Sequence, residues 1–185
     1  MKMKNLLATI LLLVSFASFS QVINERVIND SLTNKGTGDN PIMYFEGALF
    51  NGVGFDVYSD GQLREEVNYK DGELDGLAKS WYEDGQLSAE YNYKDGKEDG
   101  LYKGWYEDGQ LQVEGNYKDG EKDGLVKWWY EDGQLSAEDN YKDGKEDGLS
   151  KYWHSNGQLV YKVNYKDGKQ DGLKKEWDED GNRIE

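Results

Sequence analysis

The sequence contains no cysteine, one proline and one histidine among its 185 residues. Without thiols, the chain has no disulfide cross-link, no cysteine nucleophile and no cysteine ligand for zinc. His154 is the one residue around which a Ser/His/Asp triad could form, but it fills a repeat position that Tyr82 and Tyr106 fill elsewhere. We therefore interpret His154 as a substitution that arose as the repeat copies diverged, and we expect no such triad.

Aliphatic side chains are also scarce, since only 36% of the residues are hydrophobic and that share includes six Trp and fourteen Tyr. A thick core of Leu, Ile and Val is therefore not expected. Aromatic side chains bury large areas and keep a polar edge that can stay in contact with water. The apolar mass of this chain is mainly aromatic.

Basic residues are few, because 22 Lys and Arg stand against 37 Asp and Glu, for a net charge of −15. Loss of residues 1–20 removes Lys2, Lys4 and no acid, which makes the net charge −17. Phosphate binding depends on Lys and Arg, so nucleic acid is excluded as an expected partner. The acidic surface favours solubility, while cations and basic surfaces stay open as partners.

The N-terminus, MKMKNLLATILLLVSFASFSQ, has the three parts of an export signal. Two lysines come first, an apolar run extends from Leu6 to Phe19, and Ser18 and Ser20 form a small-x-small cleavage pattern before Gln21. The run is shorter than the roughly 20 residues of a membrane span. We predict cleavage near Gln21 and export to the periplasm, the cell surface or the medium, with an uncleaved anchor as the alternative.

A 24-residue repeat organises most of the chain, as the stretch YEDGQLSAEYNYKDGKEDGL at residues 82–101 illustrates. Asp-Gly, Asn-Tyr-Lys-Asp-Gly and Asp-Gly-Leu each recur with this spacing, and Asn156 replaces Asp in one copy. The chain is accordingly divided into a signal peptide (1–20), an N-terminal lead-in and loop (21–43), and a repeat array (44–185) with a degenerate first copy (44–57), five regular copies (58–177) and a partial cap (178–185).

Each repeat contains two Gly-marked turns and two runs rich in Tyr, Trp, Leu and Val, a pattern typical of consecutive β-hairpins. Recurrent Asp-Gly pairs would break a helix. The sequence therefore predicts an all-β fold, an elongated antiparallel β-meander of about a dozen strands in a single twisted or curled sheet. Before it, we expect a short lead-in strand and a polar loop over residues 33–40.

The turn geometry decides which side chains share a face. A two-residue type I′ turn would place Tyr106 opposite Leu111, whereas a type I turn with Gly109 in the left-handed bulge position places Trp105 there. We favour the bulged turn, because it gives a consistent apolar face. That face would hold Leu101, Trp105, Leu111, Val113 and Tyr117, with Gln110, Gln112, Glu114 and Asn116 on the other.

A ladder of aromatic residues is the candidate binding face. Its predicted members are Trp81, Trp105, Trp129, Trp153, Trp177, Tyr93, Tyr117 and Tyr141. Three interpretations stay open for it: the array's own core, a protein-binding surface, or a platform on which sugar rings stack.

Paired carboxylates such as Asp95 and Asp99 recur in every copy at turn positions, where Asp-Gly is favoured for backbone geometry alone. An enzyme site is normally singular, and these loops lack the ligand pattern of an EF-hand. We therefore expect no catalytic residue, no metal site and no cofactor.

The unit YEDGQLSAEYNYKDGKEDGLYKGW resembles the bacterial variant of the MORN repeat, the form found in proteins labelled YwqK-family antitoxins. The resemblance covers residues 44–185 and implies an elongated β-hairpin sheet used for contacts with proteins, or with membranes in some members. With the export signal, it implies a non-enzymatic exported scaffold or an antitoxin or immunity-type binder acting outside the cytoplasm. The alternative is a glycan- or envelope-binding module that uses the Trp/Tyr ladder.

Overall fold

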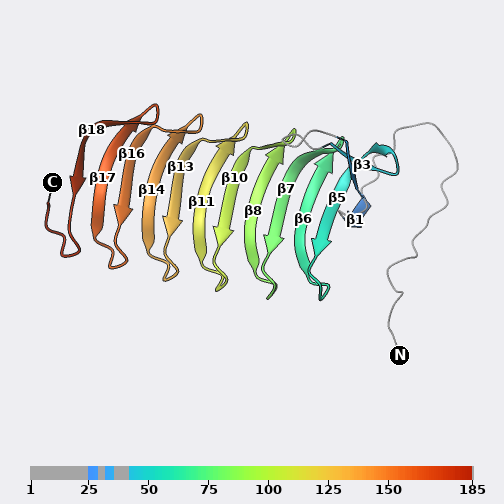
Figure 1. The fold of residues 1–185 in the computed structure, drawn as a ribbon, viewed down its shortest axis with the longest axis horizontal. Helices are drawn as coiled ribbons and strands as arrows, with labels where there is room; N and C mark the ends of the chain where they lie inside the picture. Colours follow the sequence, from blue (N-terminus) through green and yellow to red (C-terminus); the bar gives the residue numbers. More distant parts are fainter. Residues whose placement is uncertain (1–24, 29–31, 36–41, 185) are drawn as a thin grey trace.

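The computed structural model describes residues 25–28, 32–35 and 42–184, and in these residues the chain forms strands and turns without a helix. The strands lie side by side in chain order and build a long ladder (Figure 1). The predicted all-β meander is confirmed. The signal-peptide prediction falls on residues 1–20, outside the described residues, and stays a prediction.

The main sheet has fifteen strands, of which twelve form one continuous path from β1 to β18. The strands of the path are β1 (Glu25–Ile28), β5 (Gly52–Val57), β6 (Leu63–Lys70), β7 (Glu73–Trp81), β8 (Leu87–Lys94), β10 (Gly100–Trp105), β11 (Leu111–Lys118), β13 (Gly124–Trp129), β14 (Leu135–Lys142), β16 (Gly148–Trp153), β17 (Leu159–Lys166) and β18 (Lys169–Glu176). Three two-residue strands pair beside it: β9 (Lys97–Glu98), β12 (Glu121–Lys122) and β15 (Lys145–Glu146). Every pairing between repeats is antiparallel.

The N-terminal end departs from the meander. The predicted lead-in strand exists as β1, but it pairs parallel to β5, with Glu25 opposite Gly52. A separate small sheet joins β2 (Thr33–Asn34), β3 (Met43–Phe45) and β4 (Ala48–Leu49). The loop predicted over residues 33–40 is therefore wrong at its start, where Thr33 pairs with Tyr44 in strand geometry.

The turn after each Trp has the predicted bulged geometry. Gly109 N–H donates to the Tyr106 carbonyl at 2.9 Å, Gly109 has φ +84°, and Trp105 lies opposite Leu111. The Asp108 carboxylate accepts a hydrogen bond from Gln110 N–H at 2.9 Å, which explains an acidic residue before the glycine. This prediction is confirmed.

The second turn of each repeat is of a different type. Lys118 pairs with Glu121, and the two residues between them, Asp119 and Gly120, have φ +53° and +90°. Two consecutive positive φ angles define the type I′ hairpin turn, for which Asp-Gly is a preferred pair. The same geometry recurs in each KDG segment from Asp71 to Asp167.

A second bulge, at Gln112 in β11, changes which side chains share a face of the sheet. Trp105 lies opposite Leu111, but Gly104 lies opposite Val113, so Gln112 is an extra residue in β11. One inserted residue reverses the alternation that follows it. The prediction that Leu101, Trp105, Leu111, Val113 and Tyr117 share one face is therefore wrong, since Leu101 lies opposite Asn116 and Val113 lies with Tyr102 and Tyr117.

The sheet consequently has two different faces. We call one the constant face, because its residues recur nearly unchanged: the Leu, Lys and Trp that begin with Leu77, Lys79 and Trp81, and the Glu and Asn that begin with Glu66 and Asn68. We call the other the variable face. Its four varying positions hold Ala78, Tyr102, Val126, Ser150; Ser80, Gly104, Trp128, Tyr152; Ala89, Val113, Ala137, Tyr161; and Val67, Tyr91, Gly115, Asp139, Val163.

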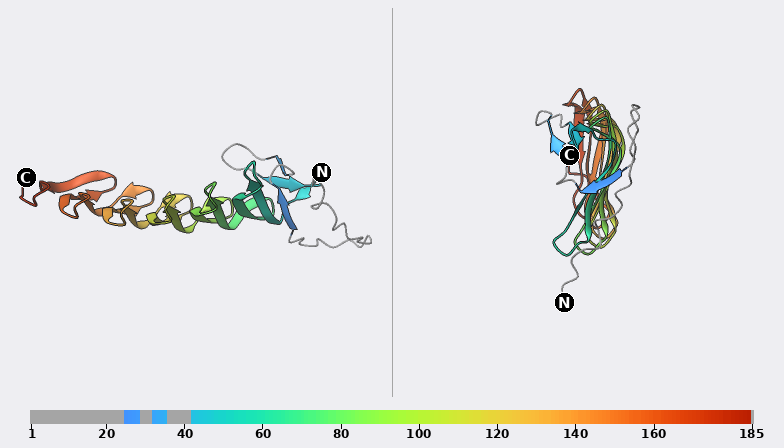
Figure 2. Two further views of the ribbon diagram at one scale, coloured as in Figure 1. Left: turned by 90° about the horizontal axis from the view of Figure 1, so that it is seen from below. Right: turned by 90° about the vertical axis from the view of Figure 1, so that its right-hand side faces the viewer.

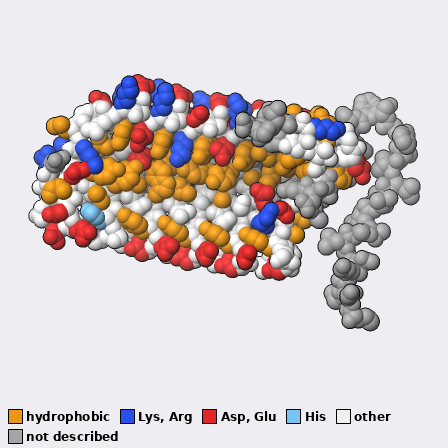
Figure 3. All heavy atoms as spheres, in the orientation of Figure 1, with side chains coloured by type: hydrophobic (Ala, Val, Ile, Leu, Met, Phe, Trp, Pro, Cys, Tyr) orange, Lys and Arg blue, Asp and Glu red, His pale blue; other side chains and the backbone are white. Residues whose placement is uncertain are grey.

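The core lies along the variable face. Val126 is fully buried, and Val67, Tyr102 and Val163 are 2–6% exposed, whereas Leu101 on the constant face is 40% exposed. The strands form a curved profile when the molecule is viewed down its long axis (Figure 2). A band of apolar side chains runs along the long axis of the face drawn in Figure 3. A single curved layer with its most buried side chains on one side thus replaces a two-layer core.

Tyrosines link each repeat to the next. Tyr82 donates its hydroxyl hydrogen to the carbonyl of Trp105, 23 residues further on, at 2.6 Å. We call these bonds the tyrosine latches, and they are Tyr58 to Trp81, Tyr82 to Trp105, Tyr106 to Trp129 and Tyr130 to Trp153. His154 takes the next position in the series, and its Nε2 is buried without a hydrogen-bond partner among the described residues.

Carboxylates also hold neighbouring repeats together. Asp99 Oδ2 accepts a hydrogen bond from the amide of Asp119, and Asp147 Oδ2 accepts one from Asp167, both at 3.3 Å. Each of these acids thereby fixes the type I′ turn of the following repeat. At these positions the acids therefore have a structural role between repeats, in addition to the turn geometry for which the sequence predicted Asp-Gly.

Candidate functional site

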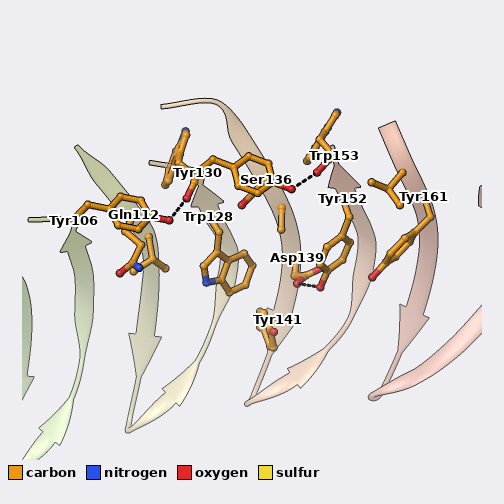
Figure 4. A pocket seen from close by; sticks show the side chains of 14 residues that line it. Tyr106, Gln112, Trp128, Tyr130, Ser136, Asp139, Tyr141, Tyr152, Trp153 and Tyr161 are labelled. Atoms are coloured by element: carbon orange, nitrogen blue, oxygen red, sulfur yellow. Dashed lines mark hydrogen bonds between the residues drawn. The ribbon is translucent and has the colours of Figure 1, made fainter. Parts of the chain in front are cut away.

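The variable face contains a hollow of about 840 Å³ toward the C-terminal half of the array, shown in Figure 4. We call it the Asp139 hollow. Its lining residues are Tyr106, Gln112, Val113, Trp128, Trp129, Tyr130, Ser136, Ala137, Asp139, Tyr141, Tyr152, Trp153, Val160 and Tyr161. Most are aromatic, and they come from several consecutive strands because neighbouring strands bring equivalent repeat positions side by side.

Differences between repeats create this hollow. Trp128 and Tyr152 fill a position that holds Ser80 and Gly104 in earlier copies, and Ala137 lies directly opposite both of them. The small side chain of Ala137 therefore lies between two large rings. Tyr161 completes the wall, since its ring stacks on that of Tyr152 with centroids 4.5 Å apart and an interplanar angle of 20°.

Asp139 contributes a carboxyl group from the middle of β14. Its side chain is 2% exposed, and Tyr152 donates a hydrogen bond to Oδ2 at 2.7 Å. The other oxygen, Oδ1, has no hydrogen-bond partner among the described residues, and the same holds for the buried hydroxyl of Ser150. Buried polar atoms are normally satisfied, so these orphan atoms mark an unusual site.

The tyrosines around Asp139 are held in their neutral form. Burial raises the pKa of Tyr141 to about 12, and the charge of Asp139 adds to the shift. Burial and the hydrogen bond to Asp139 raise the pKa of Tyr152, because that bond stabilises the protonated phenol. At neutral pH these phenols are therefore hydrogen-bond donors without charge.

Two charged residues lie near the rim. The Lys122 ammonium lies 5.1 Å from the ring centroid of Tyr141 and 5.6 Å from that of Trp128, within the range of cation–π attraction. Glu146 lies opposite Tyr141, and burial, together with the charge of Asp139, raises the pKa of its carboxyl group. The aromatic walls of the hollow thus already hold one cation at their edge.

The residues predicted as one binding face are divided between the two faces. Trp81, Trp105, Trp129 and Trp153 follow the Lys residues of the constant face and are all half-buried, whereas Tyr93, Tyr117 and Tyr141 lie opposite glycines on the variable face. The second bulge therefore divides the two sets between opposite faces of the strands, although Trp129, Trp153 and Tyr141 all border the Asp139 hollow.

Sequence reasoning missed Trp128, Asp139, Tyr152 and Tyr161 as a group. A signal for them was present, because each differs from the residues at the same repeat position in other copies. Reading the repeats for their differences, instead of for their shared markers, would have found the hollow.

Metal ions and membranes have no evident site in the described residues. Among residues 25–28, 32–35 and 42–184, no group of three or more His, Asp or Glu side chains is arranged to hold a metal ion. The described part of the chain also has no helix with the length and apolar character that a membrane crossing requires.

Comparison with known proteins identifies the repeat. The family model described as MORN repeat variant matches residues 50–71, 74–95, 98–119, 122–143 and 146–167, together more than half of the chain. A search of curated proteins gave no match.

Solved structures give weak likenesses. A mutant of S. aureus TarM in complex with fondaparinux, α-GlcNAc-glycerol and UDP is 11% identical, with a TM-score of 0.33, over 51% of this chain and 19% of that chain. The GtfA/B complex bound to UDP and GlcNAc is 12% identical, with a TM-score of 0.24, over 72% of this chain and 24% of that chain. The chain thus spans a quarter or less of these proteins, and at such TM-scores neither likeness bears on its function.

Proposed function

Because the chain belongs to the family of MORN repeat variant proteins, we propose that it is a non-enzymatic, exported protein that holds a protein partner against its variable face. MORN repeats commonly mediate binding to proteins or membranes. The finer form of the proposal is an antitoxin or immunity-type binder, which neutralises its partner by occupying it outside the cytoplasm.

The observation that carries this proposal is the concentration of sequence differences on one face. The constant face supports the array with the same side chains in each copy, while the variable face changes from copy to copy and contains the Asp139 hollow. A surface that recognises one partner needs individual residues at individual places, and aromatic residues are favoured at the centres of protein interfaces.

A non-enzymatic role agrees with the chemistry of the hollow. Its acid, Asp139, is paired with a tyrosine whose pKa is raised, and the described residues offer no histidine or second carboxylate hydrogen-bonded to either of them. General acid–base catalysis works best with a group whose pKa lies near the operating pH, and the raised pKa of Tyr152 moves this phenol further from that range. Binding is the role that this arrangement can perform.

The constant face supports a second candidate, a glycan- or envelope-binding module. Trp81, Trp105, Trp129 and Trp153 recur there every 24 residues and are half-buried, so these partly exposed residues form an evenly spaced row. The apolar C–H face of a sugar ring can stack on the face of an aromatic ring.

Two double variants distinguish the faces. Trp128→Ser with Tyr161→Ala changes the variable face to side chains that other copies carry at Ser80, Ala89 and Ala137. Leu101→Ala with Leu125→Ala is the control, because these two leucines on the constant face are 40% and 39% exposed. Circular dichroism must first show that both variants keep the sheet.

Capture from the native cell envelope is the measurement. We expect the unaltered chain and the Leu101→Ala/Leu125→Ala variant to retain the same polypeptide, and the Trp128→Ser/Tyr161→Ala variant to lose it. Retention of that polypeptide by the Trp128→Ser/Tyr161→Ala variant would refute binding through the variable face. Capture of polysaccharide instead, lost on replacing the tryptophans of the constant face, would establish the glycan-binding alternative.

A further inference from the structure

Asp139 is not required by the repeat that contains it. The equivalent positions hold Val67, Tyr91, Gly115 and Val163, and the array pairs its strands in the same register at each of them. A carboxyl group at this position therefore has no general role in the sheet.

Its burial is unfavourable in the isolated chain. Tyr152 satisfies Oδ2 at 2.7 Å, while Oδ1 is buried without a partner among the described residues. Burying a carboxylate that lacks compensating hydrogen bonds and a counter-charge costs free energy, and replacing such a group by an apolar residue is often neutral or stabilising. A ligand that brings N–H donors and positive charge into the hollow would remove this cost.

The walls of the hollow suit a planar cation. Trp128, Tyr152 and Tyr161 present aromatic rings around Ala137, and the Lys122 ammonium at the rim already lies within 5.6 Å of two ring centroids. A guanidinium group is planar, weakly hydrated and able to stack on aromatic rings while its N–H groups bind a carboxylate. It matches both features of the site better than an ammonium group does.

Charge outside the hollow favours the same ligand. Tyr106 and Tyr130 line the hollow, and each is followed directly by two acids of its turn, Glu107-Asp108 and Glu131-Asp132. The whole chain carries a net charge of −15. Such a surface attracts basic partners over a distance of about one Debye length. A neutral sugar could donate to Asp139 but would leave its charge uncompensated.

We propose that the Asp139 hollow is the receptor for an arginine side chain of the partner protein, with the guanidinium donating to Asp139 Oδ1 between the ring of Trp128 and the stacked rings of Tyr152 and Tyr161. This inference rests on the proposed protein-binding function and specifies how the partner is recognised. Asp139 supplies the charge, and the aromatic walls supply the stacking surface.

N-acetyl-arginine amide is the probe, titrated into the 15N-labelled chain while backbone amide signals are followed by NMR. N-acetyl-citrulline amide is the control ligand, because it has nearly the same shape without the charge. We expect saturable shifts confined to β13, β14, β16 and β17, and binding of citrulline at least about tenfold weaker, as the loss of one charge-assisted interaction predicts.

Three variants make the test specific. Asp139→Asn keeps the shape of the side chain, and Asp139→Val introduces the residue that the fold already accepts at Val67 and Val163. Asp119→Asn is the matched control, since it removes the same charge at an exposed turn. We expect both Asp139 variants to weaken arginine binding at least about tenfold and Asp119→Asn to change it less than about twofold.

Each other outcome overturns the inference. Equal binding of citrulline, shifts spread along the acidic turns, or undiminished binding by folded Asp139→Val would show that the hollow is not an arginine receptor. So would saturable binding of N-acetylglucosamine in place of the arginine probe. The proposed function fails separately: a partner captured through Trp128 and Tyr161 without arginine binding refutes only the inference, whereas arginine binding without such a partner refutes only the function.

Discussion

The two faces of this sheet differ in how they use the repeat. On the constant face, Lys103 pairs with Glu114 at 3.0 Å, and Lys79 pairs with Glu90 at 3.1 Å one repeat earlier. On the variable face, the position of Asp139 holds a valine, a tyrosine, a glycine or an aspartate. The first face repeats because every copy must make the same contacts with its neighbours, whereas the second is free to differ.

This difference shows which positions of a repeat protein can change from copy to copy. Asn92 and Asn140 on the constant face donate side-chain hydrogen bonds to the carbonyls of Leu101 and Leu149, each nine residues further on. These local bonds and ion pairs recur from copy to copy, so they support the same register whichever residue the variable face carries at one position. A repeat can therefore change its Val, Tyr, Gly or Asp without losing its register.

The largest expected effect comes from breaking both faces together. Deleting the eleven residues 106–116 removes a turn and part of a strand and puts every downstream residue out of phase. Deleting the 24 residues 82–105 instead joins Trp81 to Tyr106 and restores the junction that every copy has. We expect the first variant to lose its sheet signal in circular dichroism and the second to stay folded with a lower denaturant midpoint.

A third deletion distinguishes loss of the Asp139 hollow from loss of the fold. Removing residues 106–129 is also in phase, but it takes away Trp128 from the Asp139 hollow, whereas removing residues 82–105 leaves all the lining residues in place. Both 24-residue deletions should fold alike, and only the deletion of residues 106–129 should lose arginine binding. Unfolding of all three chains would contradict the interchangeability of repeats.

Alkaline pH should weaken the variable face selectively. Burial raises the pKa of Tyr93 and of Tyr141 to about 12, above the value of 10.0 for an exposed phenol. The folded state therefore holds these protons more tightly than the unfolded state, and the resulting stability is complete below pH 10 and is lost as the pH rises through 12. Urea midpoints should fall between pH 10 and 12, and less steeply for Tyr93→Phe with Tyr141→Phe.

The next effect concerns the bulged turn at Gly109, which joins β10 to β11. Gly109 has φ +84°, and a Cβ there would lie 2.8 Å from Oε1 of Gln86 in the preceding repeat. Gly61 has the same turn position and φ +92°, but a Cβ there would meet nothing within 4 Å. Gly109→Val should lower the free energy of unfolding by about 1 to 3 kcal/mol, and Gly61→Val by less. Equal losses in urea unfolding would show that the Gln86 contact is unimportant.

A smaller effect is expected from removing one tyrosine latch. Tyr82→Phe deletes the hydrogen bond to the Trp105 carbonyl and should lower the free energy of unfolding by about 1 kcal/mol. Glu83→Gln, at the exposed neighbouring residue, is the control and should be close to neutral. If urea unfolding gives the same midpoint for Tyr82→Phe and the unaltered chain, the latch does not stabilise the array.

The smallest effect belongs to a single ion pair of the constant face. Lys103 and Glu114 are each about one-third exposed, so Lys103→Ala should lower the free energy of unfolding by no more than about 1 kcal/mol. The loss should shrink at high salt, because exposed charges are screened. A salt-independent loss would indicate that the lysine acts through packing of its stem on the sheet.

Much of the fold could be predicted from the sequence, because turns are local. The positive φ of Gly109 and the pairing of Trp105 with Leu111 follow from four consecutive residues. The bulge at Gln112 has no comparable signature, since neither Gly nor Pro marks it, and that one residue reversed the predicted faces. Because the predicted faces placed Trp105 together with Tyr117, they could not show which residues line the Asp139 hollow.

The tyrosine latches end before the last strand, and this gives the array a weak end. His154 occupies the position from which a fifth tyrosine would reach Trp177, so β18 is held by its pairing with β17 and by the Asn156 amide bound to the Glu179 carbonyl, without a tyrosine latch. Amide hydrogens in β18 should therefore exchange with solvent faster than those in β8 or β11. Local opening that begins at the C-terminus would proceed inward one hairpin at a time, so fluctuations would reach the hairpin that carries Tyr152 and Tyr161 earlier than those near β6.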